Sequence, residues 1–245
     1  MEEKYRSHMV NEEGKEIQWR YGSAPEYSVV NKLFEEGRTK EWPSGSLEET
    51  VQNVVKSWEM ELSHKTCLDD FRSINPSKFK FSVNGKKFLS AEETLNLGSY
   101  NALLQSQMPL EMQGYRAEEE SFDSSHHVFK TAFPRGFAWE LLKLFSGPPE
   151  ITFKFRHWGY MEGPYKGHGP TGEVVEFIGM AIIKVDENLR AEQVEIFYDP
   201  GDLFGGLLKG PKLSSEESAK QDHADLEESL TVNLTPTQEK CPFSI

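Results

Sequence analysis

The stretch from Glu150 to Asp199 limits most strongly what this chain can fold into. It contains three strand-like runs, and the longest connection between them is rich in glycine. Alternation divides the first run between two faces, one with Ile151, Phe153, Phe155 and His157, the other with Thr152, Lys154, Arg156 and Trp158. The second run, 173–185, is long enough for a bent central strand, with Gly179 as the predicted bulge or bend. With the third run, 191–198, these strands predict a curved antiparallel sheet.

The part of the chain before this sheet is predicted to be mainly helical. Ser46 and Glu49 have the spacing of a capping box, which starts a helix running to about Thr66. Its apolar residues fall on one stripe that packs against a hydrophobic surface: Leu47, Val51, Val54, Val55, Trp58 and Leu62. The polar remainder, which includes Gln52, Lys56 and Glu59, is predicted to face solvent, as is His64.

Four shorter elements complete the prediction. They are a helix at 29–36, a hairpin at 79–89 around an Asn-Gly turn, a helix at 91–107 and an apolar helix at 136–145. Ser90 and Glu93 form a second capping box at the start of the third element. His126 and His127 are predicted in a strand, where neighbouring side chains point to opposite faces and cannot share a metal ion.

Composition narrows the class of partner and the compartment. A net charge of -13 repels phosphate backbones and anionic lipid, so we expect no nucleic acid partner and no membrane insertion. No apolar stretch suits a secretory signal or a spanning helix. The two cysteines, Cys67 and Cys241, form neither a disulfide framework nor a metal motif. These features predict a cytoplasmic protein with no metal and no cofactor.

The order of elements predicts both the domain organisation and the fold class. Residues 1–45 are predicted to form an irregular arm with one short helix, and 46–210 a single domain. Residues 211–245 are acidic and poor in apolar periodicity, which predicts a disordered tail. Helices followed by antiparallel strands indicate an α+β fold. Its curved, mostly antiparallel sheet wraps around the N-terminal helices and forms a cone-shaped pocket.

Several long segments resemble a known family. They include EWPSGSLEETVQNVVKSWEME, SVNGKKFLSAEETLNLGSYNALLQ, AFPRGFAWELL, FKFRHWGYMEGPYKGHGPTGEVVEFIGMAIIKVD and FYDPGDLFGGLLKG. Over roughly residues 5–210 the chain resembles the plant pathogen-related protein family. That family is similar to the nuclear transport factor 2-like superfamily, which includes SnoaL-like polyketide cyclases and many non-catalytic members. The resemblance implies an α+β cone, a plant cell and a role tied to defence, but no particular reaction.

The candidate site residues follow from this resemblance and from the strand pattern. Asp199 matches the late-strand carboxylate of the cyclases, and it is either an acid/base group in the cone or the cap of an Asp-Pro-Gly turn. His157 either orients a ligand oxygen or is a core histidine. The residues predicted to line a ligand site are Trp58, Trp139, Phe155, Tyr160 and Tyr198. The glycine-rich connection 159–172 is predicted to be a lid.

Two classes of function stay open. In the first, the protein binds a small hydrophobic metabolite in its cone, or docks onto a metabolic enzyme, without doing chemistry itself. The alternative is a cofactor-independent cyclase, isomerase or lyase, in which Asp199 shuttles a proton and His157 or Tyr160 holds an oxyanion. A homodimer through the sheet is predicted for either class.

Overall fold

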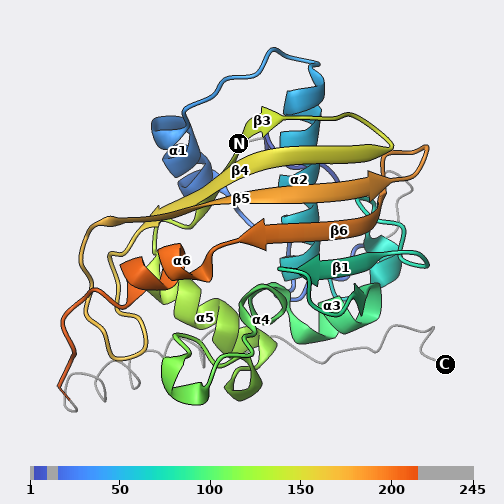
Figure 1. Ribbon diagram of the computed structural model, residues 1–245. Helices are drawn as coiled ribbons and strands as arrows, with labels where there is room; N and C mark the ends of the chain where they lie inside the picture. Colours follow the sequence, from blue (N-terminus) through green and yellow to red (C-terminus); the bar gives the residue numbers. More distant parts are fainter. Residues whose placement is uncertain (1–2, 10–15, 215–245) are drawn as a thin grey trace.

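The protein is an α+β domain built on one curved, unclosed sheet (Figure 1). Its computed structural model describes residues 3–9 and 16–214, so most of the predicted tail lies outside the described residues. Within these ranges, six strands follow the order β2-β1-β6-β5-β4-β3. The long helix α2, Leu47–His64, crosses behind the strands in Figure 1. The predicted fold class, with helices packed on a curved and mostly antiparallel sheet, is confirmed.

Neighbouring strands of the sheet run antiparallel in every pair but one. The strands are β1 (Lys80–Val83), β2 (Leu89–Ser90), β3 (Ala138–Leu144), β4 (Glu150–Tyr160), β5 (Val174–Val185) and β6 (Ala191–Tyr198). β1 pairs with β6 in parallel. The predicted hairpin at 79–89 is present, and Asn84 and Gly85 both have the positive φ that its turn requires.

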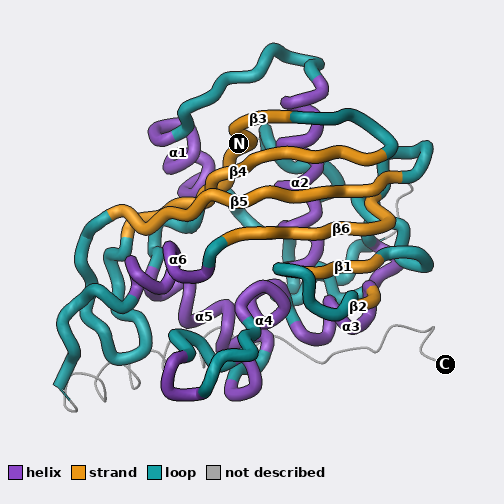
Figure 2. The backbone as a smooth tube through the Cα atoms, in the orientation of Figure 1, coloured by secondary structure: helices purple, strands orange, loops and turns teal. Residues whose placement is uncertain are grey.

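Of the bulge or bend predicted at Gly179, the bulge is wrong. The pairing of β4 with β5 is continuous through this residue, and the irregularities of the sheet lie between Lys184 and Val185 and between Leu141 and Lys143. Gly179 instead faces Phe155 across the strands, and a Cβ there would lie 2.3 Å from the ring. The glycine therefore makes room for an aromatic ring. β6 pairing also starts at Gly179. Beyond it β5 pairs with β4, and the other edge of β4 stays paired with β3 as far as Trp158 (Figure 2).

Helix α2 begins where its cap predicts, but it is buried on more faces than its stripe indicates. The Ser46 side chain accepts a hydrogen bond from Glu49 N at 3.2 Å. Gln52 and Lys56, predicted to face solvent, are both buried. Helix α1, Ser28–Gly37, and the N-terminal arm cover this side of α2, because Tyr5 and Phe34 pack there.

Three helix and strand assignments differ from the prediction. The predicted helix at 136–145 is wrong, because this stretch contains strand β3. Helices α1 and α2 both contact the strand, so its apolar residues are buried without a helical or alternating pattern. His126 and His127 lie on helix α5, Phe122–Ala132, which Ser121 caps in a box with Ser124. Gly98, with a φ of 84°, divides the predicted helix 91–107 into α3 (Ala91–Leu97) and α4 (Ser99–Leu104).

The C-terminal part of the described chain adds helix α6, Pro200–Leu207, which the sequence analysis missed. The connection 161–173 is held to the end of α5 and to the segment that follows α6: Glu162 N donates to Ala132 O at 3.2 Å, and Gly169 N donates to Pro211 O at 2.8 Å. This placement gives no support to a lid. None of the helices among the described residues is long and apolar enough to cross a membrane.

Candidate ligand-binding site

A narrow cavity, here called the inner hollow, lies between α2 and the concave face of the sheet. Its volume is about 40 Å³. Helix α2, β3, β4, β5 and β6 supply nearly all of its lining, which consists of Val55, Trp58, Glu59, Leu103, Trp139, Phe153, Phe155, His157, Phe177, Ala181, Ile183, Val194, Ile196 and Tyr198. The inner hollow is therefore mainly apolar and aromatic, as ligand pockets are.

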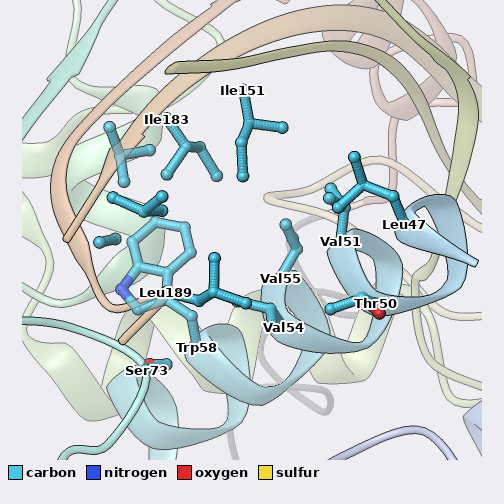
Figure 3. A pocket seen from close by; sticks show the side chains of 13 residues that line it. Leu47, Thr50, Val51, Val54, Val55, Trp58, Ser73, Ile151, Ile183 and Leu189 are labelled. Atoms are coloured by element: carbon cyan, nitrogen blue, oxygen red, sulfur yellow. The ribbon is translucent and has the colours of Figure 1, made fainter. Parts of the chain in front are cut away.

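A second cavity, the upper hollow, lies further along α2 toward its N-terminus and measures about 30 Å³. Figure 3 shows Ile151 and Ile183 pointing from the sheet toward Val51 and Val55 of α2. Four residues line both hollows: Val55, Trp58, Ile183 and Val194. Side chains fill most of the space inside the curved sheet. Two small cavities with a shared wall remain.

The polar groups of the inner hollow gather around His157. Its Nδ1 lies 2.9 Å from the Ala138 carbonyl oxygen, and because a carbonyl oxygen only accepts, this nitrogen carries a proton. Its Nε2 faces Glu59 Oε1 at 3.7 Å, which is too long for a direct hydrogen bond. The Glu59 side chain is 39% exposed, so this pair marks the end of the hollow nearest solvent.

Two further polar groups lie deeper. The Tyr198 hydroxyl donates to Leu103 O at 3.1 Å, and burial raises the pKa of this phenol well above its usual range. The Trp58 indole N–H is buried and has no hydrogen-bond partner among the described residues. A buried donor left unpaired costs about 1–3 kcal/mol. Besides the His157–Glu59 pair, Trp58 is therefore a wall residue of the inner hollow whose polar atom lacks a partner.

The structure brings five of the seven predicted site residues together. Trp58, Trp139, Phe155, His157 and Tyr198 all line the inner hollow. Tyr160 does not, because it packs with the outer cluster around α1 and lies under the Arg135 guanidinium, 4.3 Å from the ring centroid.

Asp199 is also absent from the linings of both hollows. It is exposed and caps α6, where its Oδ1 accepts a hydrogen bond from Gly201 N at 2.8 Å. This placement matches the cap alternative and gives no support to an acid/base role in the cone. A general base must reach the proton it removes directly or through one water.

Sequence reasoning missed Glu59, which it placed on the solvated side of α2. The residue follows Val55 by four positions, so both side chains lie on the same side of the helix. Its position four residues after Val55, beside the apolar stripe, is the sequence signal that could have identified Glu59 as a lining residue. Within the described part of the chain, no group of three or more histidine, cysteine, aspartate or glutamate side chains could hold a metal ion.

These features define a class of protein: an α+β domain whose curved sheet and long helix enclose small apolar cavities with a His–Glu pair at the open end. The chain is 48% identical to the pathogen-related protein of Hordeum vulgare over 218 residues, which cover 88% of this chain and 93% of that protein. It belongs to the pathogen-related protein family. No family model matches the chain.

Two solved structures show more distant similarity. A SnoaL-like protein from Jannaschia sp. CCS1 is 15% identical, with a TM-score of 0.39, over 71% of this chain and 100% of that one. A protein with a ketosteroid isomerase-like fold from Catenulispora acidiphila is 7% identical, with a TM-score of 0.36, over 66% of this chain and 95% of that one.

Proposed function

We propose that this chain is a defence-associated protein that binds a small, mainly apolar molecule in the inner hollow without changing it chemically. The name of the barley relative supports the association with defence. The lining supports the class of ligand, because Trp139, Phe155 and Phe177 supply aromatic surface and few polar groups converge there.

The observation that carries this proposal is the unpaired indole N–H of Trp58. This residue lines both hollows, and its Nε1 is buried with no hydrogen-bond acceptor in the described ranges. A ligand that presents an acceptor to this N–H recovers the cost of leaving it unpaired, whereas a purely hydrocarbon ligand does not. The expected ligand therefore has an apolar body and one hydrogen-bond acceptor.

The size of the hollows sets a second requirement. At about 40 and 30 Å³, each has room for about one water molecule. A ligand the size of a benzene ring must therefore displace a side chain. Trp58 is the residue to move, because it belongs to the wall between the two hollows and its displacement would join them.

Two probes of similar shape test the proposal. Anisole and ethylbenzene differ mainly in one ether oxygen, which can accept a hydrogen bond. We expect both to bind the full chain, and anisole to bind about 5- to 10-fold more tightly, the value of one net hydrogen bond. In Trp58→Phe, which keeps an aromatic ring but removes the N–H, the preference for anisole should disappear. Calorimetric titration measures both affinities.

A matched pair of variants on β5 locates the binding. Ala181 lines the inner hollow, so Ala181→Leu should fill it and abolish binding of both probes. Ile182 is the next residue and faces the other side of the sheet, so Ile182→Leu should leave both affinities unchanged. If neither probe binds the native chain at its solubility limit, or if both bind Ala181→Leu normally, the inner hollow is not the binding site.

The His157–Glu59 pair favours a second candidate function, proton transfer on a bound carbonyl compound. With Asp199 outside the hollow, Glu59 replaces it as the carboxylate near the ligand. Exchange of the α-protons of cyclohexanone in D2O, followed by NMR, tests this function. Catalysed exchange that is lost in both His157→Gln and Glu59→Gln supports it, and exchange no faster than in buffer excludes it for this ketone.

Docking onto a metabolic enzyme and dimerisation through the sheet remain predictions. The outer face of the sheet offers some apolar surface for either partner, since Ile178 is 40% and Phe197 is 39% exposed. Helix α1 covers the part of this face around Trp158. Sedimentation of the full chain, compared with Ile178→Lys, tests the dimer: a native dimer that becomes a monomer in the variant is the expected result.

A further inference from the structure

Lys56, near the middle of α2, is buried without a partner. Its exposed fraction is 2%, and its Nζ has no hydrogen-bond partner in the described part of the chain. Lys65, which follows the last residue of α2, provides a contrast: it is 1% exposed, and its Nζ donates to Glu61 Oε1 and to Asp70 O, both at 2.8 Å. Buried polar groups are normally satisfied as Lys65 is. Lys56 therefore needs a functional explanation.

The Lys56 amine lies in a polar recess between α1, α2, β3 and the N-terminal arm. The recess has a volume of about 20 Å³, and its lining is Arg6, Val30, Asn31, Phe34, Lys56, Glu59, Phe137, Ala138 and Trp139. The Nζ lies 3.1 Å from the centroid of the Phe34 ring and 4.5 Å from that of Tyr5. The Tyr5 hydroxyl is also buried and unpaired among the described residues. Tyr5 does not line the recess, so Lys56 is the unsatisfied group that the recess places beside a cavity.

The recess also changes the charge of the amine. Burial and, to a lesser extent, the nearby Arg6 guanidinium lower the pKa of Lys56 to about 6, against the opposing effect of Glu59, Glu3 and Glu35. At pH 7 about nine-tenths of an amine with this pKa is neutral, compared with less than a thousandth of an ordinary lysine. A neutral lysine amine in a desolvated site is a nucleophile toward carbonyl groups.

We propose that Lys56 captures a small aldehyde or ketone in this recess as an imine. The nitrogen lone pair forms a bond to the carbonyl carbon, and the π electrons of the carbonyl bond move to its oxygen. A proton passes from nitrogen to that oxygen to give a carbinolamine. The C–O bond then breaks, the oxygen leaves as water after taking a second proton, and the nitrogen loses its remaining proton. Glu59 lines the recess and is the carboxylate placed to relay these protons.

The same surroundings allow a purely structural role for Lys56. If the amine is held as an ammonium ion, the Phe34 and Tyr5 rings stabilise it by cation–π interactions, and it has no lone pair to offer. The two roles differ in how reactivity depends on pH, and the difference can be measured on the native chain. The recess shares Glu59 and Trp139 with the inner hollow, but Lys56 itself does not line that hollow.

Reductive trapping with acetaldehyde and sodium cyanoborohydride tests the proposal on the full chain. Acetaldehyde is larger than the recess of about 20 Å³, so a neighbouring side chain must move to admit it. Peptide mass spectrometry identifies each ethylated lysine. At pH 7 we expect Lys56 to be ethylated at least about tenfold faster than Lys65, which is equally buried but paired. The rate at Lys56 should level off above about pH 7, whereas the rate at the exposed Lys154 should continue to rise toward pH 10.

Two results would overturn the proposal. One is a Lys56 that stays as unreactive as Lys65 over the whole pH range. The other is a Lys56 whose rate follows that of Lys154 up to pH 10, which indicates an ammonium ion held by the rings. Lys56→Arg, which keeps a positive charge but forms no imine, should lose the fast reaction and retain the slow ethylation of the other lysines.

Discussion

Acidification from pH 7 to pH 5 should cost the folded state about 4 kcal/mol through two partly buried histidines, His64 and His126. Burial lowers the pKa of each imidazole to about 4, from an ordinary value of 6.5. Above pH 6.5 both rings are neutral in the folded and the unfolded chain. Below it the unfolded chain binds protons that the folded chain does not. The stability present above pH 6.5 is therefore lost as the pH falls toward 4.

Burial is the main reason why the folded state resists protonation, and the carbonyl oxygen beside each ring opposes it by raising the pKa of the imidazole. His126 Nδ1 lies 2.8 Å from Phe122 O, and its ring stacks on that of Phe122 at 4.2 Å. His64 Nδ1 lies 3.2 Å from Met60 O. Among the charged groups near these rings, Arg20 lowers the pKa of both, Arg6 lowers that of His64, and Asp123 raises that of His126. Burial outweighs the remaining contributions in each case.

The magnitude follows from proton linkage. At pH 5 an imidazole with a pKa of 6.5 is about 97% protonated, and one with a pKa of about 4 is about 9% protonated. Integrating the difference in bound protons from pH 7 to pH 5 gives about 2 kcal/mol for each histidine. Most of this loss occurs above the range in which ordinary carboxylates titrate, so the histidines dominate it.

Urea unfolding at pH 7 and pH 5 measures the effect. His64→Asn and His126→Asn remove the titration, and the asparagine amide can place an N–H near the position of Nδ1. We expect the native chain to lose about 4 kcal/mol between the two pH values and each variant about 2 kcal/mol. The comparison at pH 7, where both rings are neutral, gives the packing cost of each substitution alone. If both variants lose as much unfolding free energy between pH 7 and pH 5 as the native chain does, the reasoning is refuted.

Three further predictions concern stability and are measured by the same unfolding assay. Glu61→Gln should cost about 3–5 kcal/mol, because it leaves Lys65 buried without its carboxylate; a loss under about 1 kcal/mol would contradict this. Gly179→Ala should cost about 1–3 kcal/mol through its clash with Phe155, and Phe155→Leu in the same chain should recover part of the loss. Lys56→Met should stabilise the chain by about 1–4 kcal/mol, and a loss of stability would show that the amine is already well paired.

The sequence predicts those elements whose signals are local. The Ser46 cap and the apolar stripe locate α2, and alternation identifies β4 and its inner face, including Phe155 and His157. Strand β3 was mistaken for a helix because both of its faces are covered, which removes the alternation that identifies a strand. Helix α6 was missed although Asp199 followed by Pro200 is a helix-start signal.

The site depends on contacts between distant parts of the chain, and a local sequence pattern cannot show such contacts. Trp58 belongs to the predicted stripe, so its place in the hollow follows from the helical period. Lys56 and Glu59 are polar residues outside the stripe, and their local pattern is that of a solvated face. They line a recess only because the arm around Arg6 and helix α1 fold over α2.

Helix α2 is therefore informative about function through its polar residues more than through its apolar ones. Gln52 satisfies Leu141 N with its side-chain oxygen at 3.3 Å, and Glu61 and Lys65 satisfy each other. Against this background, the unpaired N–H of Trp58 and the unpaired amine of Lys56 stand out on one helix, two residues apart. A third buried atom of α2, Asn53 Oδ1, also has no partner among the described residues, but it lines none of the three cavities. Trp58 and Lys56 do line cavities, where an occupant can pair them.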